Sequence, residues 1–541
     1  MIYNQGNTTP VPNLDLLTFI LDSEFTWADA DTPLSAEAQY PEKHLTTADV
    51  CALTRQFAYF LRHRYAIGSA GHGKDVVVAV STGQSVLPAA FYGVVAAGAI
   101  YSSASYAATE SELTRQVEDG PAKLIICSKD RRDLAERAAR GAGLPDRNVL
   151  ILESHPKIRL YSADDSVECD FRGSLDWKRI TDAEELRKSK ICLVYSSGTT
   201  GLPKGVLLSH LNLVAAAHIP SVKSRQAWGR RNVKLSGRTL AHLPSAHIAG
   251  LMAYFVRPVL EGRLVYWMPT FQLDAFLKYC GELNITQMFT VPPIIAAITR
   301  HPAAKERFKH LMHALTGAAP ISRDLQEVAR QKLPVRVDVS WGMSETTGGV
   351  TFTPIERKDV IGSIGVLMNN MLLRLIDEDG RDVEPGQPGE GLIKGPTVVQ
   401  GYHNNPEGNK GAFTEDGWLR TGDIFRMENG LLFIELIKYK GSQVAPAELE
   451  GVLTAHPSVI DAAVIGVERE DTEVPRGYVV LAPDAVGKVS EADIVAYVAG
   501  KVSNAKRLRG GVRFIDAVPR SAVGKILRKD LRALQKREAK L

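Results

Sequence analysis

The sequence lacks paired cysteines, long apolar runs and an excess of charge of one sign. Its five cysteines lie far apart and have neither the spacing of a zinc site nor that of a disulfide framework. No apolar run reaches the ~18 residues of a membrane-spanning helix, and residues 1–15 lack the basic and apolar segments of a secretory signal. A net charge of +4 argues against a nucleic-acid surface. We therefore expect an intracellular protein in a reducing compartment, with no membrane span and no nucleic-acid partner.

The order of apolar segments predicts a fold of the α/β class. Strand-like runs at 76–80 and 124–127 alternate with helix-like runs at 86–97 and 134–142, which is typical of a parallel sheet covered by helices. With 541 residues the chain exceeds what one core usually serves. Beyond Gly362, short strands separated by glycines indicate a small β subdomain within the large N-terminal domain.

The pattern changes again near Glu435, where mixed strands and helices begin. We therefore expect a large N-terminal domain at 1–434 and a smaller, mobile α+β C-terminal domain at 435–541.

A loop rich in glycine and hydroxyl groups, residues 195–205, follows the apolar run 191–194. Glycines let backbone N–H groups approach an anion, and a lysine adds positive charge. The spacing differs from that of a Walker loop, which excludes the usual nucleotide-hydrolase motif. We predict a polyphosphate site, in preference to a plain connecting loop, at Ser196, Ser197, Gly198, Thr199, Thr200, Gly201 and Lys204.

Two further strand ends carry residues suited to a nucleotide. One strand leads into a turn of small side chains that leaves room for a flat ligand, at Gly317, Ala318 and Ala319. The strand at 337–340 ends in an aromatic ring, a hydroxyl and a carboxylate, in the order Trp341, Gly342, Met343, Ser344 and Glu345. Ligands of open α/β sheets bind at such carboxyl ends of strands.

Six motifs, in order along nearly the whole chain, resemble those of the adenylate-forming enzymes, and within them the acyl-CoA synthetases similar to coumarate-CoA ligase. They are residues 195–205, 315–320, 341–345, 421–423, 440–450 and 519–528. The resemblance implies that a carboxylate attacks the α-phosphate of ATP, that pyrophosphate leaves, and that a CoA thiol then displaces AMP. A small carboxylic acid, ATP, Mg²⁺ and coenzyme A are the implied substrates and cofactors.

The resemblance also implies roles for single residues of the N-terminal domain. Glu345 is the implied Mg²⁺ ligand, and Trp341 stacks on adenine where the family usually has tyrosine. Asp423 accepts hydrogen bonds from the ribose hydroxyls, although an aspartate after glycine is equally typical of a turn. His247 matches the gate between acyl pocket and CoA tunnel, whereas a lone histidine among small residues is more often structural.

In the C-terminal domain, Lys525 is the implied bridge between the carboxylate and the α-phosphate. Lys438 and Gln443 match positions that contact the nucleotide phosphate and the intermediate, and Lys440 and Gly441 match the CoA side of the site. The sequence departs from the family just before them, because Val-Asp-Arg-Leu-Lys is missing between Ile434 and Glu435. Five extended residues reach ~16 Å, and this segment is the family's hinge.

The short hinge leaves several hypotheses open. The first is an ATP-dependent acyl-CoA ligase. The second is an adenylate-forming enzyme without CoA transfer, either luciferase-like or loading a carrier protein. The third is an impaired nucleotide-binding protein. The missing residues are either a property of the enzyme or an exon-boundary error in the sequence.

The acyl pocket is expected around His242, His247, Ala249, Tyr254 and 317–319. Its small side chains suggest a roomy pocket for an aryl or medium-chain acid. The tripeptide Ala539-Lys540-Leu541 has the form of a peroxisomal address. We therefore expect a peroxisomal import receptor as a partner and a peroxisomal location, with the cytoplasm as the alternative.

Overall fold

The computed structural model describes most of the chain. The described residues are 1–196, 203–229, 237–319, 321, 323–358, 360–377, 379–434, 437–439, 442–444, 446–469, 472–519, 526 and 528–538. Within them, no helix combines the length and the apolar character needed to cross a membrane. Their five cysteines are all unpaired thiols, and four of them are buried.

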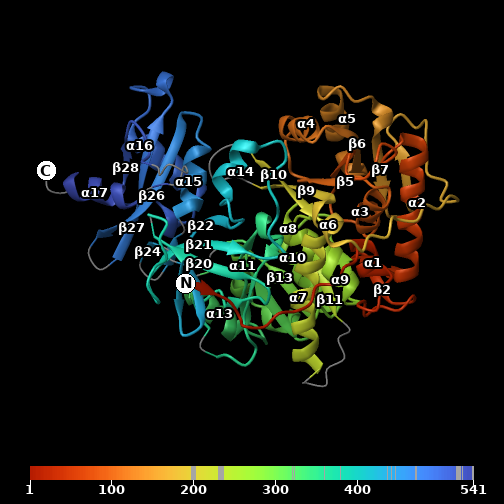
Figure 1. The fold of residues 1–541 in the computed structure, drawn as a ribbon, viewed down its shortest axis with the longest axis horizontal. Helices are drawn as coiled ribbons and strands as arrows, with labels where there is room; N and C mark the ends of the chain where they lie inside the picture. Colours follow the sequence, from red (N-terminus) through yellow and green to blue (C-terminus); the bar gives the residue numbers. More distant parts are fainter. Residues whose placement is uncertain are drawn as a thin grey trace.

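A seven-stranded sheet dominates the first third of the chain (Figure 1). Its order is β10-β9-β5-β4-β6-β7-β8, with five parallel central strands and antiparallel edge strands β10 and β8. The strands are β4 (Val76–Val80), β5 (Ile100–Ala104), β6 (Ala122–Ser128), β7 (Val149–Glu153), β8 (Arg159–Ser162), β9 (Lys190–Ser196) and β10 (Lys204–Ser209).

Helices cover both faces of this sheet. Val77 and Ala79 of β4 pack in one core with α2 (Thr47–Tyr65) and α3 (Leu87–Ala96), whereas Val76, Val78 and Val80 pack in another with α4 (Glu110–Asp119) and α5 (Arg132–Gly141). Side chains alternate across a strand, so an all-apolar strand is buried on both sides. The first core also receives α1 (Leu16–Leu21) and α7 (His210–Gly229), and α6 (Ala183–Lys188) contacts α7.

Two smaller sheets with their helices share a further core. In the four-stranded sheet, β11 (Arg238–Ala241), β12 (Leu264–Trp267) and β2 (Pro33–Glu37) are parallel, and β3 (Tyr40–Thr46) is antiparallel. The parallel three-stranded sheet consists of β13 (Gln287–Thr290), β14 (His313–Thr316) and β15 (Val337–Val339). The helices are α10 (Leu273–Glu282), α11 (Pro292–Arg300), α12 (Ala304–Arg307) and α13 (Arg323–Lys332).

A five-stranded antiparallel sheet completes the N-terminal part, in the order β1-β20-β21-β22-β23. The strands are β1 (Ile2–Tyr3), β20 (Leu372–Ile376), β21 (Gly389–Lys394), β22 (Leu419–Glu428) and β23 (Leu431–Ile434), with α14 (Pro406–Ala412) beside β22. This sheet is the β subdomain expected beyond Gly362, and its apolar face joins the same core as β13 to β15.

The C-terminal part has its own sheet and helices, drawn in blue in Figure 1. A hairpin of β24 (Ile437–Tyr439) and β25 (Ser442–Val444) precedes the sheet β26 (Val459–Arg469), β27 (Thr472–Leu481) and β28 (Val512–Phe514). Helices α15 (Pro446–Thr454) and α16 (Glu491–Lys501) pack on one face and α17 (Arg528–Glu538) on the other. The predicted fold class is confirmed, whereas the boundary at 434/435 stays a prediction.

Candidate active site

The hairpin of β9 and β10 fixes both ends of the predicted phosphate loop. Ser196 pairs with Lys204 across the two antiparallel strands, and the Ser196 hydroxyl donates to the Lys204 carbonyl at 3.4 Å. The Lys204 ammonium lies 5.1 Å from the centre of the Tyr402 ring. Five residues of the predicted set, Ser197, Gly198, Thr199, Thr200 and Gly201, lie outside the described residues.

Tyr402 connects Lys204 to the predicted metal ligand. Its hydroxyl donates to Oε1 of Glu345 at 2.9 Å, and burial together with this carboxylate raises the pKa of Tyr402 well above its usual value. Glu345 is 5% exposed and forms no ion pair with another described residue. Tyr402 was not predicted from the sequence, because no motif surrounds it.

The described residues contain no cluster of three side chains able to ligate a metal. Mg²⁺ that binds with a nucleotide does not require such a cluster, because it is usually held by one or two carboxylates and the substrate phosphates. Glu345 offers such a carboxylate, since its Oε2 accepts no hydrogen bond from the described residues.

Close backbone approaches just after β14 and β15 leave no room for a side chain at Gly317 and Gly342. A Cβ on Gly317 would lie 2.7 Å from the Ser340 carbonyl oxygen, and a Cβ on Gly342 would lie 2.0 Å from the Gly348 carbonyl oxygen. Ala318 has a φ of 64°, in the left-handed region, and its side chain is exposed next to Ala319. The turn at 317–319 is therefore built from small residues in close contact with other backbone, and its role in binding a ligand stays a prediction.

Trp341 contacts the predicted ribose-binding residue directly. Its indole Nε1 donates to Oδ2 of Asp423 at 2.8 Å, and its ring packs edge-on against Phe425 of β22 at 4.9 Å. Burial raises the pKa of Asp423, and the Trp341 hydrogen bond opposes this rise. The sequence predicts an adenine-stacking role for Trp341 but gives no sign of this bond. Further along this motif, Met343 and Ser344 are half-exposed and Glu345 is buried.

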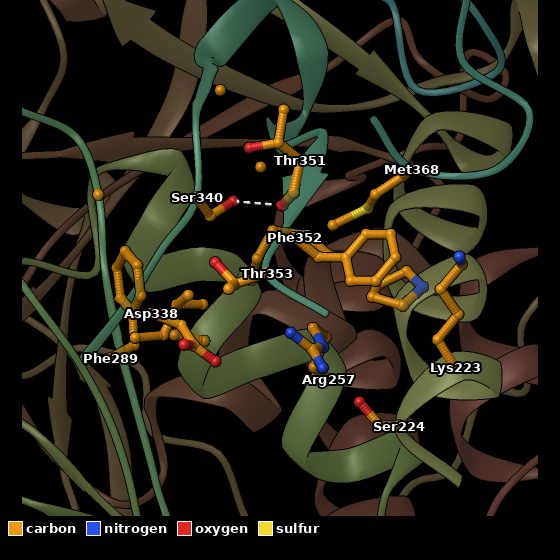
Figure 2. Close-up of a pocket in the computed structure, with 18 of the residues that line it drawn as sticks. Lys223, Ser224, Arg257, Phe289, Asp338, Ser340, Thr351, Phe352, Thr353 and Met368 are labelled. Carbon is orange, nitrogen blue, oxygen red and sulfur yellow. Dashed lines mark hydrogen bonds between the residues drawn. The ribbon is translucent and has the colours of Figure 1, made fainter. Parts of the chain in front are cut away.

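A cavity of about 550 Å³ begins at these strand ends. Its walls include Gly317, Ala318 and Gly342 at one end, and Lys223, Arg257 and Glu261 at the other. Figure 2 shows Phe352 and Thr353 between the Ser340 end and the Arg257 side. The volume lies within the range of about 300–1,000 Å³ that is typical of small-molecule sites.

One wall of the cavity is a helix interrupted by a π turn. The segment runs from α8 (Ile248–Gly250) through η3 (Leu251–Val256) to α9 (Arg257–Leu260), and η3 has π geometry. A π turn shifts the helical phase, and such turns are frequent at functional sites. Ala249, Met252 and Arg257 thereby all reach the cavity.

Two residues that the sequence places in the acyl pocket lie outside the cavity. His242 is buried, with Nδ1 2.8 Å from the Leu240 carbonyl and Nε2 2.9 Å from the Thr290 hydroxyl. The Tyr254 hydroxyl is buried and accepts from the backbone N–H groups of His242 and Leu243. Both side chains bond core segments to each other and do not line this cavity, so their acyl-pocket role stays a prediction.

His247 lies at the start of α8 and is exposed, although enough protein surrounds it that desolvation lowers its pKa. It does not line the cavity, whereas Ile248 and Ala249 beside it do. Its role as a gate stays a prediction.

The structure describes only some of the predicted site residues of the C-terminal domain. The backbones of Lys438 and Gln443 pair with each other in the β24/β25 hairpin. Lys440, Gly441, Lys525 and the tripeptide 539–541 lie outside the described residues, so their roles stay predictions. Only residues 435 and 436 separate the end of β23 from the start of β24.

Comparison with known proteins agrees with this geometry. The AMP-binding enzyme family matches residues 25–403, and the AMP-binding enzyme C-terminal domain matches residues 448–525. An Emericella nidulans protein assigned as an acyl-coenzyme A synthetase is 43% identical over 98% of both chains. A phenylacetyl-CoA ligase of Aspergillus niger is 32% identical over the full length of both.

Among solved structures, ATP-bound MatB from Rhodopseudomonas palustris superposes with a TM-score of 0.67 at 26% identity, covering 96% of this chain and 99% of that one. The match therefore extends over both domains. The chain belongs to the AMP-binding enzyme family.

Proposed function

We propose that this protein is an ATP-dependent acyl-CoA ligase that converts a carboxylic acid into its CoA thioester through an acyl-adenylate. The observation that carries the proposal is the cavity at the ends of β14 and β15. It begins at Gly317, Ala318 and Gly342, and Trp341, the residue before Gly342, contacts Asp423. An acid in this cavity has its carboxylate beside a nucleotide site.

The first step is a displacement at phosphorus. A carboxylate oxygen forms a bond to the α-phosphorus of ATP, and the bond from this phosphorus to the pyrophosphate oxygen breaks. Two anions must approach each other, so the enzyme's main task is to position them and to offset their charge. We assign this task to Lys204 and, on the C-terminal domain, to Lys525.

The adenosine end is held by Asp423 and Trp341. Asp423 must be ionised to accept hydrogen bonds from both ribose hydroxyls, and the Trp341 N–H favours that ionised form because it donates to Oδ2. The small side chains at 317–319, of which Ala318 is exposed, leave room for the flat adenine ring.

Glu345 would hold Mg²⁺ together with the phosphates of ATP. The bound ion supplies positive charge that offsets the charge developing on the leaving pyrophosphate. Tyr402 holds one oxygen of Glu345 and thereby orients the other toward the site.

In the second step the CoA sulfur, after loss of the thiol proton, forms a bond to the carbonyl carbon as AMP leaves. We assign Lys438 and Gln443 to the intermediate, Lys440 and Gly441 to CoA, and His247 to the passage between the two ligands.

The test is product analysis. The purified chain with ATP, Mg²⁺, CoA and a panel of aromatic and fatty acids should form AMP, pyrophosphate and acyl-CoA in equal amounts with at least one acid. ATP binding by calorimetry without pyrophosphate release from any acid would instead support a nucleotide-binding protein without catalysis.

The short connection between β23 and β24 favours a second candidate, adenylation without transfer to CoA. Restricted rotation of the small domain would leave the first step intact and slow the second. Insertion of Val-Asp-Arg-Leu-Lys after Ile434 should then raise thioester formation relative to pyrophosphate release. An unchanged ratio, with thioester already formed by the unaltered chain, would contradict this candidate.

A further inference from the structure

We call the end of the cavity that is lined by Lys223, Arg257, Arg263 and Glu261 its far end. These four residues carry three positive charges and one negative charge. Glu261 is 4% exposed and is the acceptor for two arginines, at 3.2 Å from Arg257 and 2.6 Å from Arg263, as well as for the Ser221 hydroxyl at 2.6 Å. One carboxylate therefore serves two guanidinium groups. The Nε atoms of both arginines are buried and have no hydrogen-bond partner in the described part of the chain.

Lys223 of α7 adds a further cation to this end. Its ammonium group lies 4.1 Å from the centre of the Phe352 ring, and none of the described carboxylates forms an ion pair with it. Burial lowers the pKa of Lys223, and no neighbouring charge opposes this effect. In Figure 2 the ammonium group lies beside the Phe352 ring, with Arg257 below that ring.

The other carboxylates that line the cavity are not available to neutralise Lys223. Asp338 pairs with Arg336 at 2.5 Å and lies 3.5 Å from His313. Glu356 is exposed and has an interaction partner of its own. Among the described residues, the far end therefore has an ammonium group without an ion-pair partner, and the Arg257 side chain lines the same cavity.

The near end of the cavity, at the ends of β14 and β15, differs from the far end in charge. Gly317, Ala318 and Gly342 contribute no charged group. An acid that places its reacting carboxylate there directs its other end toward Lys223 and Arg257. A partly desolvated cation without an ion-pair partner is costly, and an anion offsets that cost by a charge-assisted hydrogen bond.

We propose that the preferred substrate carries a second carboxylate at the end remote from the reacting one, and that Lys223 binds it with the help of Arg257. This inference rests on the proposed function, because it takes the cavity to be the acyl pocket. It narrows the expected substrate class from aryl or medium-chain acids in general to acids with two carboxylates.

The experiment compares acids in matched pairs. Hexanoic and hexanedioic acid, octanoic and octanedioic acid, and the monomethyl esters of both diacids serve as probes in a pyrophosphate-release assay. For the better-fitting length, kcat/KM should be at least about tenfold higher for the diacid than for the monoacid and for the ester, since a site built to bind a polar group rejects analogues that lack it.

Variants of Lys223 distinguish the effect of its charge from the effect of its shape. Lys223→Met should lower the diacid-to-monoacid ratio at least about tenfold, whereas Lys223→Arg should preserve it. The matched control is Lys278→Met on α10, a lysine 6.0 Å from the Tyr279 ring that does not line the cavity. A monoacid preference in the unaltered enzyme, or a ratio unaffected by Lys223→Met, would overturn the inference.

Binding distinguishes failure of this inference from failure of the proposed function. Calorimetry with octanedioic acid should give a Kd about tenfold weaker for Lys223→Met than for the unaltered chain. Equal affinities would refute the role of Lys223. Lysine-dependent binding of the diacid without any pyrophosphate release would support the inference and contradict the ligase.

Discussion

The two ends of the cavity are built in different ways. At the near end, backbone segments approach so closely that Gly317 and Gly342 have no space for a Cβ atom. At the far end, long charged side chains from α7 and the helix η3–α9 reach inward, among them Lys223, Arg257 and Glu261. The near end is determined by main-chain geometry, whereas the far end is determined by side chains.

This difference indicates a division of tasks. Adenylation is the same for every acid, so a rigid backbone site suits it. Acid selection requires a surface that side-chain substitutions can change without moving the strands. Substitutions at the near end should therefore affect all acids equally, and those at the far end should change stability or the choice of acid.

The largest effect is expected from Glu261→Gln at the far end. It leaves Arg257 and Arg263 without their shared carboxylate, and loss of one partner of a buried pair costs about 3–5 kcal/mol. Urea unfolding should show this loss. Glu184→Gln is the control, because Glu184 also faces two cations, at 2.8 and 3.4 Å, but is exposed, so its loss should cost less than about 1 kcal/mol.

The Glu261 carboxylate also predicts how the free energy of unfolding depends on pH. Burial alone raises the pKa of Glu261, but Arg263, Arg257 and Ser221 outweigh it, so the pKa is lowered overall. The stabilisation is therefore present above the unfolded-state pKa of about 4.3 and is lost as pH falls through the lower folded-state pKa. Glu261→Gln should flatten this acid-side decline. An equal decline in both proteins would contradict the assignment.

Gly342→Ala should reduce pyrophosphate release about 10²-fold for every acid, because the added Cβ would lie 2.0 Å from the Gly348 carbonyl oxygen and displace the site. Gly500→Ala on α16 is the control, since nothing lies within 4 Å of its added Cβ. It should be neutral or slightly stabilising. A loss that differs strongly between acids would contradict the uniform role of the near end.

Trp341→Phe should lower kcat/KM for ATP about 10- to 100-fold, because it removes a hydrogen bond to a charged group. Without the indole N–H the pKa of Asp423 rises further, so the acid limb of the pH–activity profile should move to higher pH. Trp341→Tyr, the residue usual in the family, provides the comparison. An unshifted acid limb would show that Asp423 does not need this donor.

The smallest effect is expected from Ala249→Val in the cavity wall. Two added methyl groups narrow the space and should lower kcat/KM about tenfold for aryl acids, with a smaller change for slender acids. Kinetics with benzoic and hexanoic acid would measure the difference. Equal losses for both acids would indicate that Ala249 does not shape the acyl path.

The near end could be predicted from the sequence and the far end could not. Glycines and small residues at strand ends form a local pattern, so Gly317, Ala318 and Gly342, which line the cavity, are conspicuous in the sequence. Tyr402, Lys223 and Arg257 belong to no motif, and their positions depend on how distant segments pack together. The hydrogen bonds that His242 and Tyr254 make within the core could not be predicted either, because they depend on contacts between segments.

Fold prediction succeeded for a similar reason. The all-apolar run of β4 is buried on both faces by α2 to α5, and such a run is recognisable without any tertiary information. Strand order, the π turn at η3 and the pairing of Trp341 with Asp423 depend on contacts between distant segments.

The division of tasks between the two ends is tested most directly by ATP–pyrophosphate exchange with octanoic and octanedioic acid in Gly342→Ala and Lys223→Met. Gly342→Ala should slow exchange about equally for both acids, whereas Lys223→Met should lower the ratio of diacid to monoacid exchange at least about tenfold. A change of the ratio in Gly342→Ala, or an unchanged ratio in Lys223→Met, would contradict it.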